Sequence, residues 1–350
     1  MKNLFIILSI LVLAIGCNKE DETISTPIIQ EQWKQIFSET SDKILDSKVN
    51  GEELHLISAK HFYRLKGEEI IEKRELISPN RLDDYEPLIG NNLIFRLLNF
   101  DSVMYLEFQP IKEGGSPYRV DIQNLGTDDL TFPVTSAGSV KAGRFEGQNN
   151  FIFMGRDYPS GQQFIVELKI DYNETTNTIE NIDIQERVDI VPISSGFGSS
   201  KRILNIFAAG DISFISRQYG GVYKYENNEI QQLDDLNLSS FFMDGQDTYS
   251  TYRNFNPISK SSDGGLTWTE SDFLLTGGNM LYKKGEYFIE TNNTRRIYRI
   301  GKSIETLEPF DSSQFDEDYI NSKVEFYNGK YLLIRYFYGE NQIFQKSDLD

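Results

Sequence analysis

A turn glycine followed by an apolar stretch recurs seven times along this chain of 350 residues. The glycines lie 39, 57, 63, 35, 40 and 44 residues apart, and a second apolar stretch follows each of them. They are Gly51, Gly90, Gly147, Gly210, Gly245, Gly285 and Gly329, with second stretches starting at Phe62, Met104, Phe164, Val222, Ile258, Ile297 and Ile343. A repeat of this length is typical of small units that bury their apolar faces against one another. The spacing predicts seven units of four short strands, with longer loops in the second and third.

Two pairs of segments match more closely than this general pattern. Phe62–Ile70 aligns without gaps on Val222–Ile230, and each reads as a strand, a polar turn and a new strand. Tyr282–Tyr287 aligns in the same way on Phe326–Tyr331. Because a glycine before an apolar stretch is a common pattern among 26 glycines, six and eight units stay as alternatives to seven.

An octapeptide from Ser261 to Trp268 reads Ser-Ser-Asp-Gly-Gly-Leu-Thr-Trp. We expect Asp263 to accept hydrogen bonds from N–H groups of its own turn, Gly265 to have a positive φ, Thr267 to start the next strand and Trp268 to pack beside it. The Ser-x-Asp-x-Gly-x-Thr-Trp spacing resembles the Asp box of BNR-repeat, sialidase-like β-propellers. The resemblance implies an all-β, seven-bladed β-propeller in which these residues are structural and lie on the outer rim of the fifth blade.

A ring of blades must also pair the outer edge of its last blade, because an open edge promotes aggregation. The last repeat ends at the C-terminus without a fourth strand. Trp33 lies 18 residues before Gly51, and Trp268 lies 17 residues before Gly285. Gln32–Phe37 therefore occupies the position of a fourth strand, and we predict that this N-terminal strand closes the seventh blade.

The N-terminus has the pattern of an exported protein. A short basic start precedes an apolar run, Leu4–Ala14, which is too short to span a bilayer comfortably and is typical of a signal peptide. The run ends in Leu-Ala-Ile-Gly-Cys, which resembles a bacterial lipobox. Cys17 is the only cysteine, so no disulfide within the chain is expected, and we predict that Cys17 carries a lipid. The alternative is a free thiol in an uncleaved leader.

These patterns divide the chain into three parts. Residues 1–16 are the predicted signal peptide, residues 17–30 the lipidated cysteine with a flexible acidic tether, and residues 31–350 the propeller. Lys19–Glu22 resembles the export signal of Bacteroidetes lipoproteins, which implies an outer-membrane protein exposed on the cell surface. A solvated acidic linker and a periplasmic location are the alternatives.

The charge balance excludes some partners. With 35 basic and 53 acidic residues the formal net charge is −18, which argues against nucleic acid and anionic lipid surfaces. The two histidines, His55 and His61, have no evident third ligand, and no cofactor or metal motif is present. The acidic clusters fall in expected loops and are interpreted as solvated charge; they are Asp83–Asp84, Asp128–Asp129, Asp234–Asp235 and Asp316–Asp318.

The resemblance to sialidase-like propellers does not extend to the catalytic residues of sialidases. Sialidases hold the substrate carboxylate with three arginines, the first in a Phe/Tyr-Arg-Ile-Pro motif, and the nearest string here, Phe95–Leu98, lacks the proline. We therefore assign no catalytic residue, metal or cofactor. The sequence favours a non-enzymatic, lipid-anchored binding or assembly module for a protein or glycan. The alternative is a glycoside hydrolase or lyase in the central pore, which would need two carboxylates converging on one pocket.

Overall fold

The sheets of this protein are small and antiparallel, and they follow one another in sequence order. The computed structural model describes residues 33–40, 43–76, 87–100, 103–121, 141–144, 149–156, 163–190, 203–209, 212–217, 222–233, 238–252, 257–275, 280–291, 297–310, 315, 323–337 and 340–347. Contacts divide the chain into Met1–Gln32, which lies outside the described residues, and Trp33–Asp350. The second unit is all-β.

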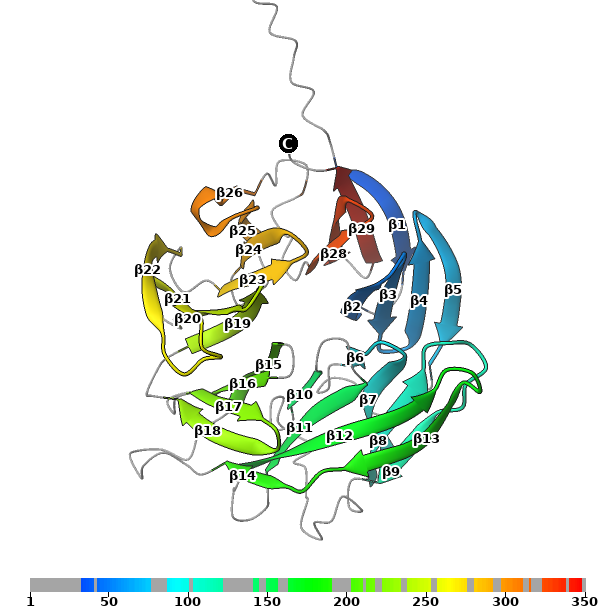
Figure 1. Cartoon of the computed structure of the whole chain (residues 1–350). Helices are drawn as coiled ribbons and strands as arrows, with labels where there is room; N and C mark the ends of the chain where they lie inside the picture. Colours follow the sequence, from blue (N-terminus) through cyan, green and yellow to red (C-terminus); the bar gives the residue numbers. More distant parts are fainter. Residues whose placement is uncertain are drawn as a thin grey trace, which may run out of the picture. The chain divides into compact units, whose positions relative to one another are not determined.

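Seven sheets, which we call blades 1 to 7, make up this unit (Figure 1). Blade 1 contains β2 (Ile44–Asn50), β3 (Glu53–Ser58), β4 (His61–Lys66) and β5 (Glu69–Glu75). Blade 2 contains β6 (Leu88–Ile89), β7 (Leu93–Phe100), β8 (Val103–Pro110) and β9 (Tyr118–Asp121). Blade 3 contains β10 (Lys141–Arg144), β11 (Asn150–Arg156), β12 (Gln163–Asn173), β13 (Thr178–Ile184) and β14 (Val188–Ile190). Blade 4 contains β15 (Ile203–Ala209), β16 (Ile212–Arg217), β17 (Val222–Glu226) and β18 (Glu229–Leu233). Blade 5 contains β19 (Leu238–Asp244), β20 (Asp247–Tyr252), β21 (Pro257–Ser261) and β22 (Thr269–Leu274). Blade 6 contains β23 (Met280–Lys284), β24 (Tyr287–Thr291), β25 (Ile297–Gly301) and β26 (Glu308–Pro309). Blade 7 contains β27 (Lys323–Tyr327), β28 (Lys330–Phe337), β29 (Glu340–Ser347) and β1 (Lys34–Thr40).

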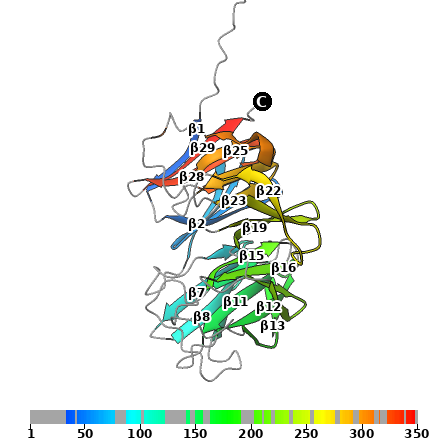
Figure 2. The same cartoon turned by 90° about the vertical axis from the view of Figure 1, so that its left-hand side faces the viewer.

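The blades form a closed ring. The first strand of each blade contacts the first strand of the next, in the order β2, β6, β10, β15, β19, β23, β27 and back to β2. Figure 2 shows the same sheets from the side. The chain is therefore a seven-bladed β-propeller, and the predicted fold and blade number are confirmed.

The glycine repeat follows from the turn between the first and second strands of each blade. Gly51, Gly245, Gly285 and Gly329 lie in this turn with φ between +57° and +71°, a region that side chains with a Cβ rarely enter. Gly147 and Gly210 lie outside the described residues. The second apolar stretch of each repeat lies in the third strand of its blade. The two pairs of segments that align without gaps form equivalent hairpins in their blades.

The N-terminal strand closes the last blade, as predicted. β1 pairs antiparallel with β29, with Lys34 opposite Gln345 and Thr40 opposite Glu340. β1 begins later than the predicted Gln32–Phe37. It also ends later, because its pairing with β29 extends to Glu340. Trp33 comes directly before β1, just as Trp268 comes directly before the fourth strand β22 of blade 5.

The hydrophobic core lies between blades. Seven clusters of buried side chains occur among the described residues, one at each contact between neighbouring blades. Fully buried tyrosines belong to these clusters, including Tyr63, Tyr225, Tyr287 and Tyr331. These large rings fill the space between the twisted sheets of neighbouring blades.

Candidate functional site

A pocket of about 280 Å³ opens between blades 1, 2 and 3. Because strands within a blade are antiparallel, the turn after the first strand and the turn after the third strand lie on one face, which we call the turn face. The pocket opens there, where the turn after β2 meets the turn after β6 and the β12–β13 hairpin. Its lining residues are Asn50, Glu53, His55, Arg64, Asn91, Asn92, Ile111, Lys112, Tyr172 and Glu174.

The third wall of the pocket comes from an overlong hairpin. β12 has 11 residues, and the turn after it reaches blade 2. There the Asn177 amide donates to the backbone oxygens of Lys112 (3.2 Å) and Glu113 (3.0 Å), while the Tyr172 hydroxyl donates to Asn177 Oδ1 (2.6 Å). These hydrogen bonds fix the hairpin against blade 2 and hold Tyr172 beside the pocket.

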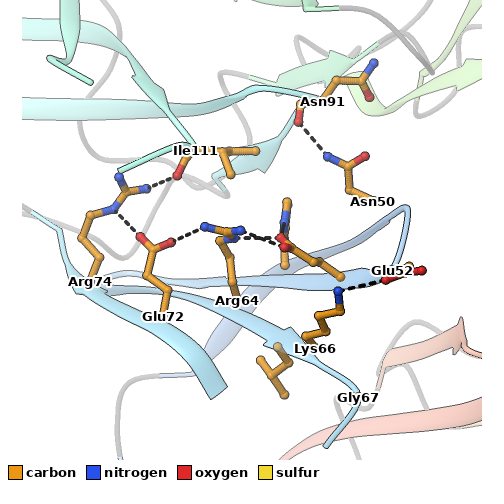
Figure 3. Close-up of polar contacts among 12 residues, drawn as sticks. Asn50, Glu52, Arg64, Lys66, Gly67, Glu72, Arg74, Asn91 and Ile111 are labelled. Atoms are coloured by element: carbon orange, nitrogen blue, oxygen red, sulfur yellow. Dashed lines mark hydrogen bonds and ion pairs between the residues drawn. The ribbon is translucent and has the colours of Figure 1, made fainter. Parts of the chain in front are cut away.

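One ion pair forms the wall of the pocket on blade 1. Arg64 donates from Nε and Nη2 to the two oxygens of Glu53, both at 2.8 Å, and from Nη1 to Glu72 at 2.9 Å. Figure 3 shows Arg64, Glu72 and Arg74 in succession, with Arg74 reaching the backbone oxygen of Ile111. The hydrogen bonds from Arg64 lower the pKa of Glu53 to about 2, and the same contact raises the pKa of Arg64. Both groups are therefore charged at neutral pH.

His55 contributes the most buried polar group of the pocket. Its side chain is 3% exposed, and its Nε2 lies 3.1 Å from a Glu53 oxygen. Burial lowers the pKa of His55, so the ring is neutral at pH 7. The Glu53 carboxylate only accepts hydrogen bonds, so the single ring proton belongs on Nε2. Nδ1 then presents a lone pair, and it has no hydrogen-bond partner among the described residues.

Removing the Glu53 charge should change how stability depends on pH. The pKa of Glu53 is about 2 in the folded protein against 4.5 for the unperturbed group. Its contribution is therefore present above pH 4.5 and is lost as the pH falls towards 2. Its side chain is 25% exposed, so we expect Glu53→Gln to cost about 1–2 kcal/mol at pH 7, less than the full pKa shift would give. The difference from the native protein should shrink between pH 4.5 and pH 2.

Urea unfolding at a series of pH values measures this difference. Glu75→Gln, at an exposed position at the end of β5, is the control for removal of a carboxylate outside the pocket. A Glu53→Gln difference that is the same at pH 6 and pH 3 would contradict the assignment.

The predicted Asp-box residues lie together in the turn between β21 and β22, at the outer strand of blade 5. Asp263 accepts hydrogen bonds from the backbone N–H groups of Leu266 (3.0 Å) and Thr267 (2.9 Å) and from the Thr267 hydroxyl (2.6 Å). These bonds, led by the one from the hydroxyl, lower the pKa of Asp263 to about 2. Ser261 bonds both Asp263 and the Gly265 N–H. Thr267 does not start the strand, because these bonds keep it in the turn and β22 begins two residues later.

This turn also joins two blades. The Trp268 indole donates to the Gly265 oxygen at 2.9 Å and packs edge-on against Phe214 of blade 4 and Phe241 of blade 5. Gly265 has a φ of +90°, and a Cβ at this position would lie 2.6 Å from the Phe214 ring. None of these residues lines the pocket between blades 1, 2 and 3.

Other sequence candidates are placed as follows. His61 lies on β4, outside the pocket lining, with its ring 5.9 Å from that of Tyr63. Arg96, in the string compared with the sialidase motif, is buried on β7 and pairs with the buried Glu107 of β8. Cys17, the export-signal residues 19–22 and all four acidic clusters lie outside the described residues. Within the described ranges no group of side chains could hold a metal ion, and no helix is long and apolar enough to cross a membrane.

Carboxylates on the first strands around the ring axis pair with lysines. Asp244 pairs with Lys283 of the next blade. Glu325 accepts hydrogen bonds from Lys284 at 3.0 Å and from the Ser47 hydroxyl at 2.5 Å. These contacts connect the first strands of blades 5 and 6, and those of blades 6, 7 and 1.

Comparison with known proteins places the chain by fold. No family profile matches it, and no characterised protein matches its sequence. Among solved structures, the β-propeller domain of Cps50 (Swd1) from Myceliophteria thermophila is similar with a TM-score of 0.57 and 10% identity, over 90% of this chain and 100% of that one. YCF48 bound to D1 peptide is similar with a TM-score of 0.52 and 12% identity, over 91% of this chain and 96% of that one. At these identities the likeness shows a shared β-propeller fold.

Proposed function

We propose that this protein is a lipid-anchored module of the bacterial cell envelope that binds a ligand or partner without transforming it. The observation that carries the proposal is the pocket between blades 1, 2 and 3. Its wall on blade 1 is an ion pair in which Arg64 and His55 both contact Glu53. A carboxylate with a pKa of about 2 has no proton to give at neutral pH, so Glu53 is unsuited to act as a general acid.

Two further observations support a binding role. The axial carboxylates Asp244 and Glu325 have lysine partners, which makes them poor candidates for the paired acid and base of a glycosidase. The similar YCF48 structure has a bound peptide, so a propeller of this size can serve as a peptide-binding module. Assembly with a protein is therefore one form that the proposed function takes.

Capture of partners from the native membrane tests this function. The intact lipoprotein is purified from its own membrane as the native protein and as a variant with Asn50→Leu and Asn92→Leu in the pocket. We expect the native protein to retain a partner that the variant loses. Glu270→Leu on the exposed strand β22 is the matched control and should behave as the native protein. Release of reducing sugars from envelope glycans by the purified protein would instead support the hydrolase alternative.

The anchor is tested separately by Cys17→Ser. We expect this variant to lose the lipid and to move from the detergent phase to the aqueous phase in a phase-separation assay, because a lipid chain contributes about 0.8 kcal/mol for each buried CH₂ group. Its melting temperature should equal that of the native propeller, since Cys17 precedes the first described strand. Unchanged detergent partitioning of Cys17→Ser would contradict the lipobox interpretation.

A further inference from the structure

We propose that the pocket between blades 1, 2 and 3 binds a neutral, hydroxyl-rich ligand, a sugar ring of a glycan, and that Asn50 Oδ1 and Asn92 Oδ1 accept hydrogen bonds from its hydroxyl groups. This inference rests on the binding role proposed above and names the ligand class for that site. It follows from the orientation of the lining amides, the donors and acceptors that they leave, and the balance of charge.

The partners of the three lining asparagines fix their orientation. Asn91 Oδ1 accepts from the Lys48 ammonium group at 2.6 Å, and an ammonium group only donates. Asn50 Nδ2 donates to the Asn91 backbone oxygen at 3.1 Å, and Asn92 Nδ2 donates to a Glu174 oxygen at 2.8 Å; both of these partners only accept. Asn50 and Asn92 therefore keep Oδ1 and one N–H each, and Asn91 keeps both N–H groups of Nδ2.

The remaining hydrogen-bonding capacity of the pocket is mixed. Asn50 Oδ1, Asn92 Oδ1 and the second Glu174 oxygen can each accept, while the amide nitrogens and the Lys112 ammonium group can donate. His55 Nδ1 is fully buried and is not available to a ligand. A suitable ligand therefore has several groups that both donate and accept, as hydroxyl groups do.

The charge of the lining argues against an ionic ligand. Glu53 and Glu174 are matched by Arg64 and Lys112, so the lining residues have no net charge. Arg64 is occupied by Glu53 and Glu72, which leaves it little capacity to bind an anion. A basic group of a ligand would lie near the positive charges of Arg64 and Lys112 without a surplus of negative charge to compensate it. A neutral ligand avoids this repulsion.

The size and the apolar part of the pocket agree with a single ring. A volume of about 280 Å³ equals that of roughly nine water molecules at 30 Å³ each. Ile111 is buried and Tyr172 is half-buried, and both line the pocket. They offer apolar surface to the C–H face of a sugar, while the polar groups contact its hydroxyls.

Saturation-transfer NMR on the full mature chain tests the inference with glucose, galactose, mannose and N-acetylglucosamine as probes. We expect at least one of these sugars to bind. Asn92→Leu, which removes the acceptor Asn92 Oδ1, should weaken its binding about 3- to 10-fold, the loss expected for one hydrogen bond. Asn181→Leu, which changes an exposed asparagine of β13 outside the pocket lining, is the matched control and should bind as the native protein does.

Asn50→Leu provides a second test at an exposed position where misfolding is not expected, and it should also weaken binding. Absence of binding by every sugar, or equal binding by the native protein and both pocket variants, would overturn the inference. Stronger binding of Nα-acetyl-lysine amide or of acetate than of any sugar would also overturn it, in favour of an ionic ligand. If the sugars fail while the intact lipoprotein still captures a partner through the pocket, the binding function stands and only the ligand class is wrong.

Discussion

Deletion of residues 33–40 should make this protein unfold or aggregate. The deletion removes the outer strand β1 and leaves the edge of β29 unpaired, and an open edge strand readily pairs with another molecule. It also removes Phe37, which is 5% exposed and packs against Tyr63, and Trp33, which packs against Phe310 and Phe315. Loss of a buried aromatic such as Phe37 costs about 3–5 kcal/mol, within a total stability of about 5–15 kcal/mol for a typical domain, and the partly buried Trp33 adds to this cost.

The matched control removes residues 18–28, which belong to the predicted tether. This truncation should leave the melting temperature almost unchanged, because it spares Trp33 and β1. Phe37→Ala is an intermediate variant that should stay folded with reduced stability, since the backbone pairing with β29 remains. Calorimetry and light scattering distinguish the three proteins. Equal melting of the two truncations would show that β1 is not needed to close the ring.

Gly265→Ala should destabilise the propeller by about 2–5 kcal/mol, far more than the same change at Gly51. Both glycines have a positive φ, +90° at Gly265 and +59° at Gly51, so alanine costs about 1–2 kcal/mol of backbone strain at either position. At Gly51 no atom lies within 4 Å of the added Cβ, whereas at Gly265 the Phe214 ring lies at 2.6 Å. Displacing this ring disturbs the contact between blades 4 and 5, at a further cost of about 1–3 kcal/mol.

Urea unfolding of the two alanine variants measures the difference. Ligand binding by the folded fraction of Gly265→Ala should be unchanged, because this turn does not line the pocket. Equal destabilisation at the two positions would show that Phe214 moves aside without cost. Loss of binding without loss of stability would mean that the turn is a functional site.

The sequence predicts the fold well because the fold is repeated. Four of the turns between first and second strands have a glycine with a positive φ, so glycine recurs with the blade, and Trp33 matches Trp268 because both precede a fourth strand. The closing strand was therefore predictable from spacing alone. Its bounds were not, since they depend on how far β29 extends as a partner.

The pocket could not be predicted in the same way. Asn50, Asn91 and Glu174 meet through blade packing although they are 41 and 83 residues apart in sequence. Asparagine in a turn is also an ordinary structural choice, so nothing in the sequence marks these three as neighbours. The overlong strand β12, which carries Glu174 towards blade 2, has no counterpart in the other blades from which it could be inferred.

The pairing of β1 with β29 also sets the order of events in folding. Lys34 lies opposite Gln345, more than 300 residues later in the chain, so closing this loop costs about 5 kcal/mol of chain entropy before any contact repays it. β1 must wait for β29, whereas the other six blades are each built from consecutive segments. Such non-local pairing is slow. Ring closure is therefore expected to be the last and slowest step, and until it is complete the unpaired edge of β29 is open to aggregation.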